Sequence, residues 1–446
     1  MSMPDTAPPA KGLRVAVIGS GISGAAAAFL LGPHHRVTLF ESAHRLGGHA
    51  NSIDLMLGGS MTTVDTGFIV YNTHNYPQFN ALLAYLDVAS QPSDMSFAVS
   101  LENGRIEYSG SGLDGLFGQR RNLLRPGHWR MLLEILRFYR QVVAFADAHD
   151  FDLVHMTLAE LLVRFGCSHA FTRGHILPMA AAIWSTPVER ILEFPAASFI
   201  RFFENHGLFR ISDRPQWRTI AGGSRCYVTA LNRAFRGRTR LGTPVESVIR
   251  SNDRVLVKPA GAPAEEFDRV VIATHADQAL AMLVRPQQHE KALLSAFDYV
   301  SNKAVVHRDP AFMPRTQRCW SSWNYLARTR DDGERLLLSY WMNRLQGLDP
   351  GDNLFVTLNP HIEPEGIIAE IAYEHPLYNR AALAAQQRLA DIQGLGGIYY
   401  CGAHFGHGFH EDGLVSAIDV ARRLGARPPW ESRDGAETAL PFARAE

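Results

Sequence analysis

The sequence predicts a two-domain α/β protein, in which a parallel sheet covered by helices is built from three separated segments and an α+β domain fills the intervals. Three observations predict this arrangement. Short β-branched apolar runs alternate with a helical segment within residues 13–41, long amphipathic stretches replace them between about residues 82 and 220, and the short runs return after residue 243. At 446 residues the chain also exceeds the size at which one hydrophobic core usually stops growing.

The first segment has the pattern of a βαβ unit. Residues 13–19, LRVAVIG, are short, apolar and β-branched, which is typical of a buried parallel strand. An alanine-rich helix is expected over residues 22–31 and a second strand over residues 36–41. This alternation favours a parallel sheet with helices on its faces.

The later segments show where this pattern is interrupted and resumed. We expect further helices over residues 129–144, 158–165 and 196–203 and near residues 414–424. We expect further strands over residues 243–250, 255–258, 268–273 and 398–402. Mixed aromatic segments in residues 299–373 favour strands of the second domain. The resulting domain boundaries are residues 1–85, 219–298 and 379–430 for the first domain, 86–218 (mostly helical) and 299–378 for the second, and 431–446 for a polar tail.

The composition excludes several classes of function. Basic and acidic residues number 44 each, so no global field recruits nucleic acid. The four cysteines lack CxxC spacing, which favours reduced thiols in a cytosol. The polar start lacks a signal-peptide pattern and no long apolar run occurs, so we expect a cytoplasmic protein that is neither secreted nor membrane-spanning.

The segment GSGISG follows the first strand directly. Gly19, Gly21 and Gly24 stand where the backbone must approach a dinucleotide pyrophosphate closely. Ile22 and Ser23 open the helix whose free N–H groups would bind that pyrophosphate. The alternative is a tight glycine turn that holds no ligand.

An acidic residue closes the second strand. Glu41 is placed to accept hydrogen bonds from a ribose, and Ser42 follows it. The complete order of strand, glycines, helix and acid favours a dinucleotide-binding site over an empty turn. This fingerprint by itself does not separate NAD from FAD.

The next residues resemble a known family. SAHRLGGHANS is similar to the RxGGRxxS-like motif of the flavin amine oxidase superfamily, whose members bind FAD. Arg45, Gly47, Gly48 and Ser52 are in register with that motif, and His49 stands where the family usually has arginine. The resemblance implies a non-covalently bound FAD in a Rossmann-like domain, joined to an α+β substrate domain as in amine oxidases and p-hydroxybenzoate hydroxylase.

The resemblance continues along the chain. Asp65, Gly67 and Phe68 match part of a DxGxxxF-like element, TIAGGS at residues 219–224 resembles the segment that returns the chain from the substrate domain, and Val245 lies where the family's backbone holds the adenine side. In VVIATHADQAL the resemblance implies flavin-site roles for two neighbouring residues, Ala273 and Thr274, with His275 in place of the usual glycine.

The closing motif of the family resembles YYCGAHFGHGFHEDGLVSAIDVARRL. Gly402, Gly413 and Leu414 match it, and Ala403 replaces the usual acid. Independently of the family, a helix that begins near Leu414 points unpaired N–H groups and a positive dipole end outward. That end suits the N1 and C2 carbonyl region of a reduced, anionic flavin, which favours hydride acceptance at N5.

Several shorter strings resemble one bacterial subgroup. IWSTP, NHGLF, QWRTIAGGS and WSSWNY are similar to predicted NAD/FAD-binding oxidoreductases that are often associated with cyclopropane-fatty-acid-type methyltransferases. Relatives of this subgroup include fatty-acyl desaturases and polyunsaturated fatty acid isomerases. The resemblance therefore implies a fatty-acyl or phospholipid substrate and a lipid methyltransferase as a partner.

Aromatic residues in the second domain are candidates for an apolar substrate pocket. We expect pocket-lining roles for Trp184, Phe203, Trp217, Trp323, Tyr325 and Trp341. The alternative is that they fill the core, which is the commoner role of such residues.

Three residues are candidates for catalysis. Lys303 is the one lysine near the start of the second substrate-domain block, where the resemblance implies a lysine that holds water against flavin N5; the alternative is a surface lysine. His206 and His404 are candidates for contact with flavin or substrate. His404, His407 and His410 lack the carboxylate or thiolate company of a metal site, and we expect no metal.

These features predict an FAD-dependent oxidoreductase that takes hydride from an aliphatic C–H bond of a fatty-acyl chain, giving desaturation or double-bond isomerisation. The alternatives are an amine oxidase that releases peroxide and a non-catalytic flavin-binding partner of a lipid methyltransferase.

Residues 119–143 combine six arginines with apolar residues at helical spacing, namely Trp129, Leu132, Leu133, Leu136, Tyr139 and Val143. This pattern predicts either an interfacial helix on the inner face of an anionic membrane or a helix packed inward.

Overall fold

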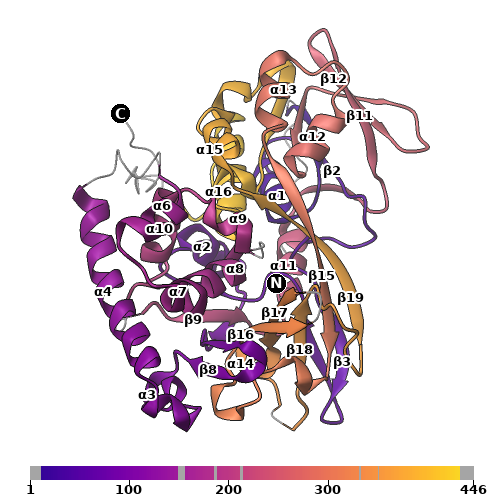
Figure 1. The fold of residues 1–446 in the computed structure, drawn as a ribbon. Coiled ribbons are helices and arrows are strands. Elements are labelled where there is room, and N and C mark those ends of the chain that lie inside the picture. The colour runs from indigo at the N-terminus through magenta and orange to yellow at the C-terminus, as the bar shows by residue number, and fades with distance from the viewer. Residues whose placement is uncertain are drawn as a thin grey trace.

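The computed structural model describes residues 12–148, 156–184, 188–210, 214–330, 333–349 and 351–431. Figure 1 shows a domain containing α1 (Ile22–Leu31) and α16 (His410–Arg423) in the upper half of the view. The second domain has its sheet in the lower half and its helices on the left, with α4 (Pro126–Ala148) along the left edge.

A parallel sheet forms the core of the first domain. In the described part of the chain it has five strands, in the spatial order β10 (Gly237–Arg240), β2 (Arg36–Phe40), β1 (Arg14–Ile18), β14 (Arg269–Ile272) and β20 (Ile398–Tyr400). The predicted α/β fold, with one sheet drawn from three segments, is therefore confirmed. The prediction lacks β10 because Arg238 and Arg240 make its run polar.

Both faces of this sheet are buried. Val15 and Val17 face one core, and their neighbours Ala16 and Ile18 face the other, because side chains alternate along a strand. The first core is covered by α1, α2 (Pro77–Tyr85), α11 (Arg225–Ala234) and α16. The second core is covered by α12 (Ala276–Met282), α13 (Gln288–Leu294), α15 (Arg380–Gln386) and the antiparallel strands β11 (Val245–Ser251), β12 (Arg254–Pro259) and β13 (Glu265–Phe267).

Two of the strands predicted after the helical insertion belong to a separate sheet. β11 and β12 pair with each other in antiparallel register and do not join the parallel sheet. A short turn connects them, so they form a hairpin, whereas parallel neighbours need a crossover connection.

The second domain contains a mixed sheet. As far as the structure describes it, seven strands lie in the order β19 (Ala369–Leu377), β15 (Asp298–His307), β18 (Phe355–Leu358), β17 (Gly333–Trp341), β16 (Trp323–Arg330), β7 (Phe97–Leu101) and β8 (Ile106–Ser109). β7 and β16 are parallel, and the other neighbours are antiparallel. β7 and β8 lie near the start of residues 86–218, a segment that otherwise consists mostly of helices, as predicted.

Helices fill the other side of the second domain. They are α3 (Gly112–Leu116), the 3-10 turn η2 (Arg120–Leu124), α4, α6 (Leu158–Arg164), α7 (His169–Phe171), the π-helical turn η3 (Thr172–Ile176), α8 (Leu177–Trp184), α9 (Val188–Leu192), α10 (Ala196–Asn205) and α14 (Met342–Gln346). An aromatic core that includes Phe138, Phe171, Phe199 and Phe203 holds several of them together. None of the described helices is both long and apolar enough to cross a membrane.

Two small sheets connect the domains. β3 (Ser52–Leu57) and β4 (Ser60–Asp65) form a hairpin after the first βαβ unit. β9 (Trp217–Ile220) pairs with both β5 (Tyr71–Asn72) and β6 (Ser90–Pro92). The strand that leaves the first domain and the strand that returns to it are therefore hydrogen-bonded neighbours.

Candidate functional site

Two glycines of the GSGISG turn allow a tight fold at the carboxyl edge of the parallel sheet. A methyl group on Gly24 would lie 1.8 Å from the carbonyl oxygen of Gly19. Gly19 has a φ of 96°, and a methyl group there would lie 2.8 Å from the Ala273 carbonyl oxygen and 3.3 Å from Thr274 Cγ2. These positions require glycine, and the start of α1 therefore lies directly against the ends of β1 and β14.

The middle glycine of this turn faces open space. A methyl group on Gly21 would meet none of the described atoms within 4 Å. Gly48 borders this space, since a methyl group there would lie 3.2 Å from Gly21 Cα. Arg45 Nη1 donates a 2.9 Å hydrogen bond to the Gly48 carbonyl oxygen, and Gly47 N donates a 3.1 Å bond to the Ser20 carbonyl oxygen. The positive end of α1 thus opens on unobstructed space, which a pyrophosphate could approach.

The acid at the end of β2 is held in a fixed position. Glu41 Oε2 accepts hydrogen bonds from Ser20 N (2.8 Å) and Ser20 Oγ (2.6 Å), and the Ser42 hydroxyl lies 3.2 Å from Oε1. Thr243 N donates to the Glu41 carbonyl oxygen (2.8 Å), which brings Val245, the first residue of β11, close to the end of β2. Oε1 also accepts a 2.8 Å hydrogen bond from Ala43 N, and a ribose hydroxyl would compete with Ser42 for this oxygen.

A second helix N-terminus lies against the start of α1. A methyl group on Gly413 would lie 2.8 Å from Ser23 Oγ, 2.9 Å from Ile22 Cγ2 and 3.8 Å from Ala403 N. Leu414, the next residue, is buried in the core beneath α1. Only the missing side chain of Gly413 lets α1 and α16 approach this closely.

The loop before α16 is fixed by a buried carboxyl. α16 begins at His410 and not near Leu414. The Asp412 carboxyl accepts hydrogen bonds from His407 N (3.0 Å) and Phe409 N (2.9 Å), which lie in the loop that leads into the helix. Burial raises the pKa of Asp412 to about 6, while these two N–H groups oppose that rise. The loop is therefore rigid where it meets the first domain.

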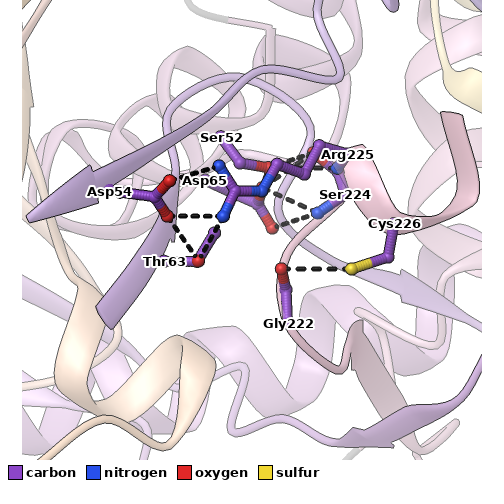
Figure 2. Close-up of polar contacts among 8 residues, drawn as sticks. All are labelled: Ser52, Asp54, Thr63, Asp65, Gly222, Ser224, Arg225 and Cys226. Carbon is purple, nitrogen blue, oxygen red and sulfur yellow. Dashed lines mark hydrogen bonds and ion pairs between the residues drawn. The ribbon is translucent and has the colours of Figure 1, made fainter. Parts of the chain in front are cut away.

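A buried carboxylate joins the segments on which the site is built. Figure 2 shows Asp65, the last residue of β4, surrounded by Ser52 and Ser224. Asp65 accepts hydrogen bonds from Ser52 Oγ (2.5 Å), Ser224 N (2.8 Å), Ser224 Oγ (2.7 Å) and Gln346 Nε2 (3.0 Å). Burial raises the pKa of Asp65 to about 6 despite these donors. TIAGGS thus returns the chain to the first domain through a contact with the DxGxxxF-like element.

Neutral histidines occupy the position where the family has arginine. His49 is half-buried, with its ring 4.9 Å from Tyr373 and 5.4 Å from His375. Burial, together with His375 and His275, lowers the pKa of His49 to about 3. Asn302 Nδ2 donates to His375 Nδ1 at 3.0 Å, and burial lowers the pKa of His375 to about 4. An uncharged cluster therefore replaces the expected cation.

The prediction for Lys303 requires correction. On β15, Asn302 and Ala304 are buried, whereas the Lys303 side chain is 53% exposed and its Nζ lies 2.5 Å from Glu370 Oε1. Strand alternation points Lys303 away from the histidine cluster. Asn302 is the residue that faces the cluster, and only the β-strand period at this position could have revealed it.

Phe68 and Gly67 lie at the start of α16. The Phe68 ring stacks on His410 with the ring centroids 3.7 Å apart, and the Tyr227 hydroxyl lies 2.5 Å from His410 Nε2. A methyl group on Gly67 would lie 2.4 Å from the His49 carbonyl oxygen. Burial lowers the pKa of His410 to about 3, so this histidine is a neutral packing group.

The two candidate histidines lie in different surroundings. His206 Nδ1 donates to the Phe202 carbonyl oxygen (2.9 Å), and its ring stacks near Trp217 (6.0 Å) and Phe409 (5.7 Å). His404 packs against Phe297 and has its ring beside Gly402, where a methyl group would lie 2.6 Å from the ring. Burial lowers the pKa of both, to about 4 for His206 and about 3 for His404. The structure does not bring them together.

The aromatic candidates for the pocket are dispersed. Phe203 lies in the core of the helical half, Trp323 packs against Tyr340 at 4.7 Å, and Trp341 packs edge-on to Trp320 at 5.4 Å. Tyr325 lines a cavity in the second domain. The side chain of Trp184 lies outside the described part of the chain. No three His, Cys, Asp or Glu residues are grouped as a metal site requires, within the described residues.

Comparison with known proteins identifies the family. Residues 20–352 match the model of flavin containing amine oxidoreductases, and the chain belongs to this family. No curated protein sequence matches it.

Solved structures share the fold. A CLA-producing fatty acid isomerase from P. acnes is 15% identical with a TM-score of 0.65, over 92% of this chain and 98% of the isomerase. Putrescine oxidase bound to putrescine is 14% identical with a TM-score of 0.67, and the match covers 94% of this chain and 100% of the oxidase. Cyclohexylamine oxidase from Brevibacterium oxydans is 16% identical with a TM-score of 0.66, and the match covers 93% of this chain and 100% of that oxidase. At these identities the likeness concerns the fold alone.

The family and the geometry agree on the cofactor. The residues that would hold FAD lie around the open space at Gly21, the fixed acid Glu41 and the N-terminus of α16. The protein is an FAD-dependent oxidoreductase.

Proposed function

We propose that this oxidoreductase acts on a fatty-acyl chain, from which an aliphatic C–H bond gives hydride to FAD. Loss of a proton from the adjacent carbon then gives a desaturated chain, whereas return of the hydride to another carbon gives an isomerised chain. The observation that carries the proposal is a cavity of about 710 Å³ in the second domain. Its lining combines a long apolar wall with cationic side chains. Such a combination complements an amphiphile with an anionic head.

The charges of the cavity argue against an amine substrate. Its lining includes the guanidinium-bearing residues Arg105, Arg125 and Arg173, and among the described lining residues the one acid, Glu102, forms an ion pair with Arg105. A protonated amine would meet like charge there, whereas a carboxylate or phosphate would be attracted. The apolar wall suits a hydrocarbon chain and comprises Leu101, Ile106, Met131, Leu177, Tyr325 and Leu336.

The surroundings of the loop before α16 also favour a hydrocarbon. His206 stacks on Trp217 and is tilted against Phe409 there, and the lowered pKa of His206 keeps its ring uncharged at neutral pH. A neutral, aromatic environment does not penalise an alkyl chain.

Bound FAD would supply the hydride acceptor at N5. The contribution of this protein chain to hydride transfer is electrostatic. The unpaired N–H groups and positive end of α16 would stabilise the negative charge that accumulates near N1 and the C2 carbonyl. Since His49 replaces arginine and has a pKa lowered to about 3, this helix end supplies the stabilisation that a guanidinium supplies elsewhere in the family.

Anaerobic substrate addition tests the proposal. Purified holoenzyme is mixed with oleate, linoleate, phospholipid, putrescine or cyclohexylamine, and the flavin absorbance and the acyl products are followed. Bleaching by a fatty-acyl compound, or a shifted double bond without net bleaching, supports the proposal. Bleaching by the amines alone would show an amine oxidase, and a flavin that stays oxidised with unaltered acyl chains would show a non-catalytic partner of a lipid methyltransferase.

A further inference from the structure

A cluster of exposed apolar residues covers α3, η2 and the first half of α4. In the described part of the chain, these elements expose six large apolar side chains, namely Leu113, Leu123, Leu124, Trp129, Leu133 and Leu136. We call this cluster the α3–α4 surface. Leu124 is 86% exposed and Leu133 66%. A soluble protein rarely leaves so many neighbouring apolar groups in water without an interaction that covers them.

Helix α4 has two apolar faces, which refines the prediction for residues 119–143. Met131, Phe138, Tyr139 and Val142 face the interior, so Tyr139 does not belong to the predicted exposed face. Trp129, Leu133 and Leu136 point outward. The outward residues are therefore additional to those that the core of the domain requires.

The outward apolar residues are held in place. Trp129 Nε1 donates a 2.9 Å hydrogen bond to the Leu123 carbonyl oxygen, and its ring lies 4.8 Å from Phe117. His128 Nε2 lies 3.0 Å from the Leu116 carbonyl oxygen, which joins α4 to α3. A fixed apolar surface loses little conformational entropy when another surface covers it.

Positive charge surrounds these apolar residues. Within residues 102–130 the ionisable groups at the surface comprise Arg105, Arg120, Arg121, Arg125 and Arg130 against the two acids Glu102 and Asp114. Glu102 pairs with Arg105 and Asp114 with Arg120 (2.6 Å), so a positive excess remains. Arginines around exposed leucines complement an anionic lipid surface, in which phosphates lie above acyl chains.

The cavity in the second domain opens at the same place. Leu124, Arg125, Pro126 and Gly127, which connect η2 to α4, line it, and Leu124 is also among the most exposed leucines. Figure 1 shows α3 and α4 along the left edge of the molecule, away from α1 and α16. The cavity therefore borders the α3–α4 surface at Leu124, and we infer that its mouth lies there.

We propose that the α3–α4 surface docks on an anionic phospholipid bilayer, so that the mouth of the cavity faces the lipid from which the substrate comes. The exposed leucines enter the acyl boundary and the arginines contact the phosphates. The docking itself needs only the surface described here. Its role in substrate supply rests on the proposed function.

Vesicle flotation with the FAD-loaded full chain tests the docking. Vesicles of pure phosphatidylcholine are compared with vesicles of phosphatidylglycerol and phosphatidylcholine, at low salt and at about 0.5 M salt. We expect flotation only with the anionic vesicles, and at least a tenfold weaker partition at high salt. The double variant Leu124→Ser/Leu133→Ser should lose flotation, and Arg120→Glu/Arg130→Glu should weaken it about tenfold or more.

Matched controls lie elsewhere on the surface. Met61, on the β3–β4 hairpin, is 69% exposed, and Met61→Ser should float like the parent protein. Arg233, exposed on α11, serves as the charge control through Arg233→Glu. Flavin content and thermal unfolding verify that each variant is folded.

Each contrary result overturns the docking. Absence of flotation at low salt, equal flotation with neutral vesicles, or unchanged flotation of the leucine variant contradicts it. A dimer that Leu124→Ser/Leu133→Ser converts to a monomer, without vesicle binding, would show that a second copy covers the surface. If the protein floats but its flavin is reduced only by amines, the docking is supported and the proposed function is contradicted. If the protein turns over dispersed fatty acid but does not float, the proposed function is supported and the docking is contradicted.

Discussion

The backbone N–H of Ser224 donates a 2.8 Å hydrogen bond to the buried carboxylate of Asp65, which joins the segment returning from the second domain to the β3–β4 hairpin of the first. Asp65→Ala should lower the free energy of unfolding by about 2–4 kcal/mol, because it leaves several buried donors without an acceptor. Urea unfolding followed by flavin and tryptophan fluorescence measures this loss.

Asp54, also visible in Figure 2, provides the control for Asp65. It is exposed and pairs with Arg225 at 2.6 Å. Asp54→Ala should change the free energy of unfolding by no more than about 1 kcal/mol, as for other exposed ion pairs. Equal effects of the two substitutions would contradict the structural role assigned to Asp65.

Gly21→Leu should give a folded protein that does not retain FAD. A side chain at Gly21 meets no described atom within 4 Å, so the fold tolerates it, but it fills the space into which the pyrophosphate must come. The ratio of flavin to protein absorbance after gel filtration measures the loss. Gly127→Leu, at another unobstructed glycine, should stay yellow. A stoichiometric flavin content in Gly21→Leu would place the cofactor elsewhere.

Lys303→Met and Asn302→Leu should differ sharply although the residues are neighbours. Lys303 pairs with Glu370 on the exposed side of β15, so Lys303→Met should leave the flavin spectrum and the reduction rate within about twofold of the parent. Asn302→Leu removes the 3.0 Å hydrogen bond to His375 Nδ1 in the histidine cluster and should alter both. Visible spectra and anaerobic stopped-flow reduction compare them, and a large effect of Lys303→Met alone would restore the original prediction for this lysine.

The protein should lose stability on acidification from pH 7 towards pH 4. Burial lowers the pKa of His49 and His175 to about 3, and of His206 and His375 to about 4, from an ordinary value of 6.5. A folded pKa below the unfolded one contributes stability that is present above pH 6.5 and is lost as the pH falls through the folded pKa. Each pKa unit corresponds to about 1.4 kcal/mol.

Buried carboxyls oppose this trend. Burial raises the pKa of Asp65 and Asp412 to about 6 and that of Glu411 to about 7. Their stability is present below the unfolded pKa and is lost as the pH rises through the folded pKa, which is the opposite sign. The histidines carry the larger shifts, so thermal unfolding measured between pH 7 and pH 4.5 should show a falling midpoint. A midpoint that rises on acidification would mean that the carboxyls dominate.

The sequence by itself determined the nucleotide-binding end of this protein. Gly19, Gly21 and Gly24 act through their own backbone, and their place between a buried strand and a helix is a local pattern. The dinucleotide site and the parallel sheet follow from such patterns, and the family resemblance adds FAD. β10 escaped prediction because its position at the sheet edge, and not its polar sequence, makes it a strand.

Only the tertiary structure decided what faces the cofactor and what faces water. Because side chains alternate along β15, Asn302 and Lys303 point to opposite sides of the sheet, but the neighbouring strands decide which side is buried. His49, His275 and His375 come from three distant segments, and their pKa values fall because burial is a sum over residues that no local pattern contains. In the same way the packing of the second domain, and not the periodicity of α4, decided that Tyr139 is buried while Leu133 remains in water.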